Sequence, residues 1–295
     1  MIRAWKHWLI ILGCISVLTA CGNDNDLGVV RVGIIDGPSQ QPISNAAAKF
    51  AKKNLRITIQ SIVFANYNDI NVALCEGKVD ANVAESLPFL VRQVQTDPKL
   101  KAAMQANNCQ LIPLTRTYTF PFGLFSRQLT SLSQLQPQSV VAIPAEAVNR
   151  SRALFLLQQA GLIQLQPNAQ NFVTVNDIVS NPYQLIIVSI DVNRLPDTVA
   201  GAALVVMNSN YAALAGLSMQ NALAVEQSIN YATILVVRRD QAQNIKFAQL
   251  ATAYHSPDAI KAAAKLSNNA AIESWGGNIL GLSNTVLPSS LSESE

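Results

Sequence analysis

Short apolar segments alternate along this chain with longer segments whose apolar residues recur at helical spacing. The short segments predict strands, because they are rich in valine and isoleucine and are bounded by turn residues. Predicted strands cover 29–35, 56–64, 78–84, 110–114, 117–126, 139–143, 184–190, 202–207 and 231–239. Helices are predicted between them, among them 42–52, 68–76, 147–160 and 240–272, the last with a break at Ser256-Pro257. Such alternation is typical of a mostly parallel α/β fold with helices on both faces.

The N-terminus differs from the rest of the chain. A basic start is followed by an apolar stretch from Leu9 to Val17, which is too short for a comfortable transmembrane helix and is typical of a signal peptide. It ends in Leu18-Thr19-Ala20-Cys21, which resembles a bacterial lipobox. We therefore expect residues 1–20 to be a lipoprotein signal peptide, Cys21 to be the lipidation site and residues 21–28 to form a tether. An ordinary signal peptide with an incidental cysteine is the alternative.

Composition excludes several classes of protein. The chain is 49% hydrophobic and 13% charged, as expected for a globular protein, and its net charge of +3 falls to about +1 without the signal peptide. It has no basic stripe, so we expect no nucleic-acid partner. Only His7 and His255 are present, which excludes a histidine-rich metal site, and we interpret His255 as a structural residue near a helix end. Without a metal-ligand cluster, GxSxG or phosphate loop, we expect no enzyme and no cofactor.

Two cysteines remain beyond the signal peptide and the lipidation site, Cys75 and Cys109. An anchored domain facing an oxidising compartment allows them to pair. Buried free cysteines are also common, so the sequence leaves both alternatives open.

The start of the predicted helix 147–160 carries two arginines, at the helix end that disfavours cations. Arg150 has Glu146 four residues earlier, so we expect a local ion pair at the surface. Arg152 has no acidic residue three or four positions away, so it needs either a distant acid or a ligand anion. With Asn149 one turn earlier, Arg152 makes a competent site for a small carboxylate, and ligands bind at this edge of α/β sheets. Both interpretations of Arg152 stay open.

Several segments together resemble the NlpA/MetQ family of lipoproteins, the methionine-binding proteins of ABC transporters. The matching segments are "VRVGIIDGP", "VFANYNDINVAL", "GKVDANVAESLPFL", "YTFPFGLFS", "VAIPAEAVNRSRALFLLQQAGLI", "VVMNSNYA" and "ESWGG". The resemblance covers about 29–277 and implies a type II periplasmic-binding fold, with two α/β lobes and a ligand cleft between them. It places lobe I at 29–115 and 229–277, lobe II at 116–228, and a flexible tail at 278–295.

The resemblance also implies ligand-binding residues. Arg152 stands where the family grips the amino-acid carboxylate, and Asn149, Asn208 and Tyr67 match further family ligand positions.

The side-chain pocket departs from the family pattern. The family's "DANAFQHKPYL" is "DANVAESLPFL" here, which puts Ala84, Ser86 and Phe89 in place of larger or more polar residues. A family asparagine aligns with Thr233, and a glutamine aligns with Glu85, which we interpret as a solvated surface residue. The expected pocket therefore has more volume than a methionine pocket.

The resemblance implies a membrane-anchored substrate-binding lipoprotein of an ABC importer. It would bind an amino acid, methionine-like or divergent, or a dipeptide, by its α-carboxylate. Its partners would be a permease, an ATPase and, through the lipid, a membrane of the bacterial cell envelope facing the periplasm. An envelope lipoprotein with a degenerate binding site is the alternative. The sequence does not identify the ligand, the permease, or the inner or outer membrane.

Overall fold

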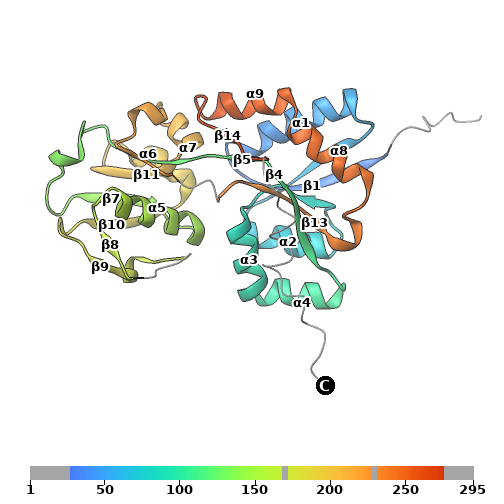
Figure 1. The fold of residues 1–295 in the computed structure, drawn as a ribbon, viewed down its shortest axis with the longest axis horizontal. Coiled ribbons are helices and arrows are strands. Elements are labelled where there is room, and N and C mark those ends of the chain that lie inside the picture. Colours follow the sequence, from blue (N-terminus) through green and yellow to red (C-terminus); the bar gives the residue numbers. More distant parts are fainter. Residues whose placement is uncertain (1–26, 168–171, 228–230, 276–295) are drawn as a thin grey trace, which may run out of the picture.

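The computed structural model describes residues 27–167, 172–227 and 231–275. The predicted signal peptide, Cys21, most of the tether and the tail lie outside these residues. Within the described part, two five-stranded sheets form the two lobes seen in Figure 1. No helix in these ranges is long and apolar enough to cross a membrane. The predicted two-lobed α/β fold is confirmed.

Lobe I contains a sheet of order β2-β1-β3-β13-β4. Its strands are β1 (Val29–Ile35), β2 (Thr58–Phe64), β3 (Ala81–Asn82), β4 (Leu111–Arg116) and β13 (Ile234–Arg238). Its helices are α1 (Gln40–Asn54), α2 (Tyr67–Cys75), α3 (Leu87–Thr96), α4 (Pro98–Ala106), α8 (Ile245–Tyr254) and α9 (Pro257–Leu266). Strand β1 is parallel to β2 and β3, whereas β13 is antiparallel to β3 and β4. Gly33 lets α2 approach β1, because a Cβ there would lie 2.7 Å from Ile70 Cγ2.

Lobe II contains a sheet of order β10-β7-β11-β6-β12. Its strands are β6 (Phe122–Phe125), β7 (Val140–Pro144), β10 (Ile186–Ile190), β11 (Leu204–Asn208) and β12 (Ala224–Val225). Its helices are α5 (Ala147–Gln159), α6 (Leu195–Thr198) and α7 (Ser209–Leu214), and β8 (Gln164–Leu165) pairs with β9 (Ile178–Ser180). Helix α5 packs on this sheet because its apolar residues are buried against Phe122 and Ile143.

The chain passes from lobe I to lobe II between β4 and β6, and returns between β12 and β13. On the way out, β5 (Tyr118–Thr119) pairs with β14 (Ile272–Glu273) near the end of the described chain. The predicted strand 117–126 is therefore two strands, interrupted at Phe120-Pro121. Proline cannot donate a ladder hydrogen bond, which explains the break. Because β6 and β13 run against their neighbours, both sheets are mixed, and the mostly parallel arrangement that we expected is wrong.

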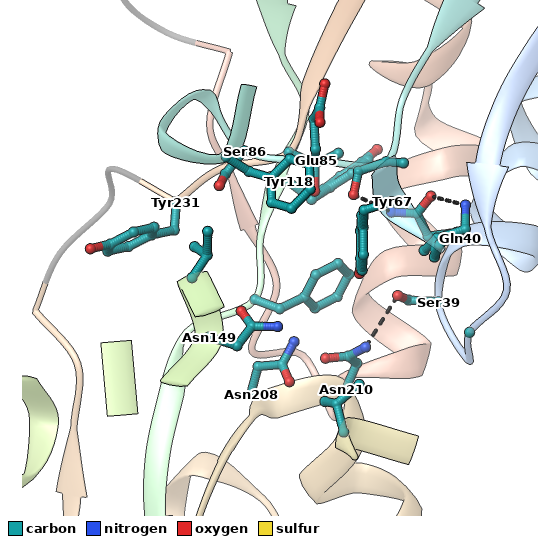
Figure 2. Close-up of a pocket in the computed structure, with 18 of the residues that line it drawn as sticks. Ser39, Gln40, Tyr67, Glu85, Ser86, Tyr118, Asn149, Asn208, Asn210 and Tyr231 are labelled. Carbon is teal, nitrogen blue, oxygen red and sulfur yellow. Dashed lines mark hydrogen bonds between the residues drawn. The ribbon is translucent and has the colours of Figure 1, made fainter. Parts of the chain in front are cut away.

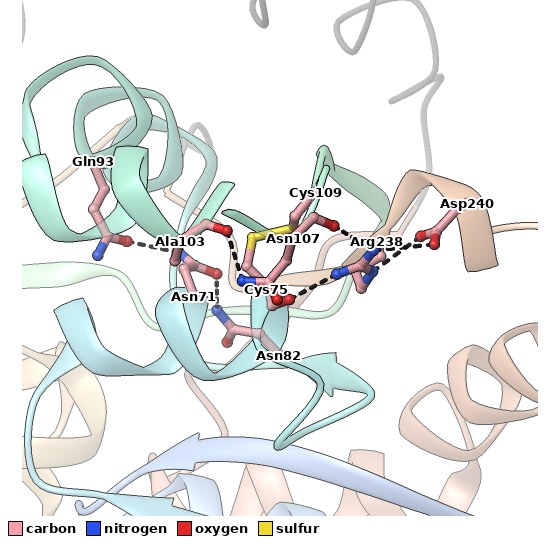
Figure 3. The surroundings of a disulfide bond; sticks show 9 residues. All are labelled: Asn71, Cys75, Asn82, Gln93, Ala103, Asn107, Cys109, Arg238 and Asp240. Carbon is pink, nitrogen blue, oxygen red and sulfur yellow. Dashed lines mark hydrogen bonds and ion pairs between the residues drawn. A yellow bond between two sulfur atoms is a disulfide. The ribbon is translucent and has the colours of Figure 1, made fainter. Parts of the chain in front are cut away.

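A disulfide joins Cys75, at the end of α2, to Cys109, just before β4, with Cα atoms 5.4 Å apart (Figure 3). Arg238 supports the same corner of lobe I. Its Nη1 donates to the Cys75 carbonyl at 2.7 Å and its Nη2 donates to the Asn107 carbonyl at 3.2 Å. Of the two alternatives for these cysteines, the structure has the paired one.

Candidate ligand-binding cleft

A cavity of about 130 Å³ lies between the two lobes and is lined by side chains from both. Figure 2 shows residues from lobe I and from lobe II extending into the same space. The structure brings all eight predicted binding residues to this cavity: Tyr67, Ala84, Ser86, Phe89, Asn149, Arg152, Asn208 and Thr233. Contact with a ligand stays a prediction for each of them.

The lobe II wall is formed by the starts of two helices that follow strands. Helix α5 follows β7, and its N-cap Glu146 is followed at intervals of three residues by Asn149 and Arg152 in the helix. Strand β11 ends at Asn208, and α7 then supplies Asn210, whose Nδ2 donates to Ser39 Oγ of lobe I at 3.1 Å. The Oδ1 atoms of both asparagines are buried and accept no hydrogen bond from a described residue. Because unpaired buried polar atoms are costly, this wall is suited to a polar ligand.

Arg152 is neutralised from within the chain. Its Nε and Nη2 donate to Oε1 and Oε2 of Glu226 at 3.0 and 2.6 Å, and both side chains are buried, at 6% and 7% exposed. The guanidinium also lies over the rings of Phe122 and Tyr231, at 4.1 and 4.6 Å from their centroids. Of the two interpretations of Arg152, the distant acid is the one present. Its Nη2 also donates to the Phe120 carbonyl at 3.2 Å, while its Nη1 donates to no other described residue.

The prediction of an ion pair between Glu146 and Arg150 is wrong. Arg150 Nη1 donates instead to the Ala145 carbonyl at 3.0 Å, and no ion pair links these two described residues. Glu146 Oε1 accepts the Val192 backbone N–H at 3.2 Å, while its Oε2 is buried without a partner in the described structure. Burial raises the pKa of the Glu146 carboxyl, an effect that these backbone hydrogen bonds and Arg150 partly oppose. The backbone donor of Val192 thus replaces the i,i+4 contact that the spacing favours.

The lobe I wall is mainly aromatic and small. The rings of Tyr67 and Phe89 lie 5.5 Å apart at a tilt of 51°. Ser86 forms an isolated antiparallel bridge with Thr233, and Ala84 is nearly fully buried behind them. Burial raises the pKa of Tyr67 to about 12, with Glu146 and Glu85 adding to the effect. Tyr67 therefore keeps its proton at neutral pH and can donate a hydrogen bond into the cleft.

Glu85 is a buried residue, so its interpretation as a solvated surface glutamate is wrong. It is 3% exposed, and its Oε1 accepts from the Nδ2 atoms of Asn71 at 2.7 Å and Asn82 at 2.9 Å. Burial raises its pKa to about 8, although the two amide hydrogen bonds oppose this. In Figure 2 its carboxyl extends away from the lobe II asparagines, and Figure 3 shows Asn71 also joined to Gln93. Glu85 is thus mostly uncharged at neutral pH and supports the wall from behind.

Contacts between described residues of the two lobes hold them against each other around the cleft. Besides the hydrogen bond between Asn210 and Ser39, Arg92 of α3 lies 4.7 Å from the ring centroid of Phe172. Asn268 Nδ2 donates to the Leu217 carbonyl at 2.9 Å. These single contacts leave a domain interface that a bridging ligand can strengthen.

His255 lies outside the cavity lining. Its Nε2 is 2.9 Å from the Arg116 carbonyl oxygen, and its ring stacks on Trp275 at 4.4 Å. Burial lowers the pKa of His255. Among the described residues, no group of three or more His, Cys, Asp or Glu side chains is placed to hold a metal ion.

Sequence reasoning missed several residues of the cleft, including Ser39, Gln40, Glu146, Asn210 and Tyr231. Gln40 Nε2 donates to the Ala84 carbonyl at 3.0 Å and thereby positions the lobe I wall. The missed polar residues lie in loops or at helix starts, and a helix start directly after a strand was the available signal.

Comparison with known proteins agrees with this architecture. The family model of the NlpA lipoproteins matches residues 30–275. The D-methionine-binding lipoprotein MetQ of Escherichia coli (strain K12) is 33% identical over 265 residues, which cover 88% of this chain and 93% of that protein.

Two solved structures are similar over most of their lengths. A periplasmic substrate-binding protein of an ABC transporter from Coxiella burnetii is 36% identical with a TM-score of 0.69, covering 83% of this chain and 100% of that chain. A nutrient-binding protein from Burkholderia cenocepacia, bound to methionine, is 30% identical with a TM-score of 0.72, covering 83% and 99%. The chain belongs to the NlpA lipoprotein family and shares the two-lobed fold of periplasmic substrate-binding proteins.

Proposed function

We propose that this protein is the substrate-binding lipoprotein of an ABC importer and that it binds an amino acid, or a dipeptide, in the interlobe cleft. One observation carries the proposal: the cavity wall holds buried amide oxygens that accept from no described residue, at Asn208 and Asn210. A ligand that pairs with these atoms removes a desolvation cost and gains binding free energy. The methionine-binding relatives support an amino acid as the ligand class.

The ligand's α-carboxylate would lie against lobe II. Asn149 and Asn208 both extend toward the cavity in Figure 2, and their amide groups can donate to a carboxylate. Arg152 would add its Nη1 edge, while the bidentate pair with Glu226 holds the guanidinium in place. From lobe I, the Tyr67 hydroxyl would donate across the cleft. A ligand held in this way touches both lobes.

The apolar part of the ligand's side chain would lie against lobe I. Tyr67 and Phe89 offer ring surface, whereas Ala84, Ser86 and Thr233 are small. This wall suits methionine or another amino acid with an unbranched side chain, and it leaves room for a larger one. The affinity for methionine would be lower than in a pocket with a large aromatic at position 84, because contact area is lost.

Binding would favour the closed arrangement of the lobes, since a ligand shifts a conformational equilibrium by its preference for one state. The closed form would deliver the ligand to a permease and its ATPase. The lipid on Cys21 would keep the protein at a membrane of the cell envelope, facing the periplasm. The family's lipoprotein character supports this anchor.

Thermal unfolding of the full chain in detergent tests the proposal. A panel of single amino acids and dipeptides at millimolar concentration should include at least one that raises the unfolding midpoint. At a hundredfold excess over Kd, a ligand adds about 2.7 kcal/mol to the free energy of unfolding. Asn149→Ala and Asn208→Ala should reduce the shift, and Ser133→Ala, on the surface of lobe II, should leave it. If no compound shifts the midpoint, the proposal fails, and an envelope lipoprotein with a degenerate site becomes the better account.

A further inference from the structure

The charges that line the cleft do not balance. Three lining side chains are acidic or basic, Glu85, Glu146 and Arg152. Arg152 is paired with Glu226, and Glu85 is turned into lobe I between two asparagine amides. Among the described residues that line the cavity, Glu146 is therefore the acid that is neither paired with a cation nor turned into lobe I.

The surroundings of Glu146 favour a positive group. Its Oε2 is buried without a partner, and the guanidinium of Arg150 is directed to the Ala145 carbonyl instead. Burial raises the pKa of the nearby Tyr211 hydroxyl, and Tyr67, Glu146, Asp191 and Asp36 raise it further. This end of the cleft is therefore acidic, while the end at Arg152 and Glu226 is neutral overall.

Two amides on the same wall can bind either a hydrogen-bond donor or a hydrogen-bond acceptor of the ligand. Asn210 is 3% exposed, and its Oδ1, like that of Asn208, is buried and unpaired in the described structure. An amide can present either its oxygen or its nitrogen, so these residues fit a donor as well as an acceptor. Burial raises the pKa of Glu146, but a cation bound at its Oε2 favours the ionised form, which only accepts hydrogen bonds, so Glu146 decides the sign of the charge that the cleft prefers.

We infer that the cleft selects an amino-acid-like ligand with a net positive charge, whose additional ammonium group binds Glu146 Oε2. The inference rests on the proposed function above and names the substrate class of that same site. Glu146 is the N-cap of α5 and Arg152 is the sixth residue of this helix, so their backbone positions lie roughly 9 Å apart along the helix axis. An extended basic amino acid spans a comparable distance between its carboxylate and its side-chain ammonium. Asn210 would complete the ammonium site with its oxygen.

Matched ligand pairs test this inference. L-Lysine and L-norleucine differ by one ammonium group, as do L-ornithine and L-norvaline. In calorimetric titrations of the full chain in detergent, we expect the basic member of at least one pair to bind at least tenfold more tightly than its neutral counterpart. We expect Glu146→Gln to reduce that ratio to less than threefold while the affinity for the neutral member changes by less than threefold. Glutamine keeps the acceptor for the Val192 N–H, and the unfolding midpoint of the variant checks that it folds.

Asp197→Asn is the matched control, because Asp197 is an exposed acid of α6 in the same lobe that does not line the cavity. It should leave the ratio within twofold. Equal affinities within both pairs, or a ratio that Glu146→Gln does not change, would overturn the inference while amino-acid binding itself still stands. If no amino acid of either kind binds, the proposed function fails together with the inference.

Discussion

The two walls of the cleft differ in chemistry. Lobe II contributes Glu146, Asn149, Arg152, Asn208 and Asn210, all charged or amide side chains on or beside two helix starts. Lobe I contributes mainly rings and small side chains, with its one lining acid, Glu85, turned away from the cleft. In the proposed function, lobe II therefore recognises the charged groups of the ligand, and lobe I contacts the apolar part of its side chain.

The difference extends to the support behind each wall. The lobe II wall depends on an ion pair between Arg152 and Glu226, which are far apart in the sequence. The lobe I wall depends on uncharged hydrogen bonds around Glu85, Asn71 and Asn82. The recognition of ligand charge and the recognition of ligand shape are thus expected to respond to different substitutions.

The largest effect is expected when the ion pair behind lobe II is broken. Arg152→Ala leaves Glu226 buried without its counter-charge, so the free energy of unfolding should fall by about 3–5 kcal/mol in denaturant titrations. Arg150→Ala is the matched control on the same helix, and its effect should stay within about 0.5 kcal/mol. Replacing both partners, as Arg152→Met with Glu226→Leu, should recover most of the loss. Equal losses from the two single arginine variants would contradict this account of the wall.

Because of Glu85, the free energy of unfolding should fall as pH rises. The unfolded chain loses this proton near 4.5, whereas burial keeps it bound in the folded protein up to about 8. The stability from the protonated form is therefore fully present below 4.5 and is lost as the pH approaches 8. The slope should be about 1.4 kcal/mol per pH unit in this window. Glu85→Gln should remove that contribution, as measured by denaturant titrations across the window.

Glu76→Gln is the control for this pH dependence, since Glu76 pairs with Lys78 at the surface. Its pH profile should match that of the unsubstituted protein. A slope that persists in Glu85→Gln would show that Glu85 does not carry it.

Phe89→Ala should weaken the recognition of the ligand's shape and leave the recognition of its charge unchanged. Removing the ring beside Tyr67 should weaken the binding of neutral amino acids about tenfold, because aromatic contact area is lost. The ratio of L-lysine to L-norleucine affinity should stay within twofold of that of the unsubstituted protein. Calorimetric titration measures both quantities. A large change in the ratio would mean that the two walls do not act separately.

The smallest effect is expected at the contact between the lobes. Ser39→Ala removes the hydrogen bond from Asn210, which should destabilise the closed arrangement by about 0.5–1.5 kcal/mol. Ligand affinity should fall by roughly twofold to tenfold for all ligands alike. An effect confined to basic ligands would instead place Ser39 in the recognition of charge.

Local patterns in the sequence predicted much of the fold but little of the electrostatics. The spacing of apolar residues and the positions of turn residues located most strands. They also located the helix that begins at Ala147 and the helix break at Ser256-Pro257. The antiparallel β6 and β13 were not predicted, because strand direction depends on how the chain returns between lobes. Likewise, the partner of Arg152 lies 74 residues away, which no rule of local spacing can find.

The candidate site shows the same limit at shorter range. The family resemblance predicted eight residues that line one cavity in the structure. Two acids beside them, Glu146 and Glu85, were given the wrong surroundings. Glu146 has favourable helical spacing to Arg150, yet the backbone N–H of Val192 binds it instead. Glu85 has no local signal of burial, since its partner Asn71 comes from α2. Both corrections arise from tertiary contacts that compete with local ones.

The central claim is that lobe II amides hold an amino acid in the cleft, and calorimetric titration of the full chain tests it most directly. The titration compares the unsubstituted protein with the double variant Asn149→Ala/Asn208→Ala, using the amino acid that most raises the unfolding midpoint. We predict saturable binding at one site and a loss of affinity of at least tenfold in the variant. Unchanged affinity in a variant that remains folded would contradict the account.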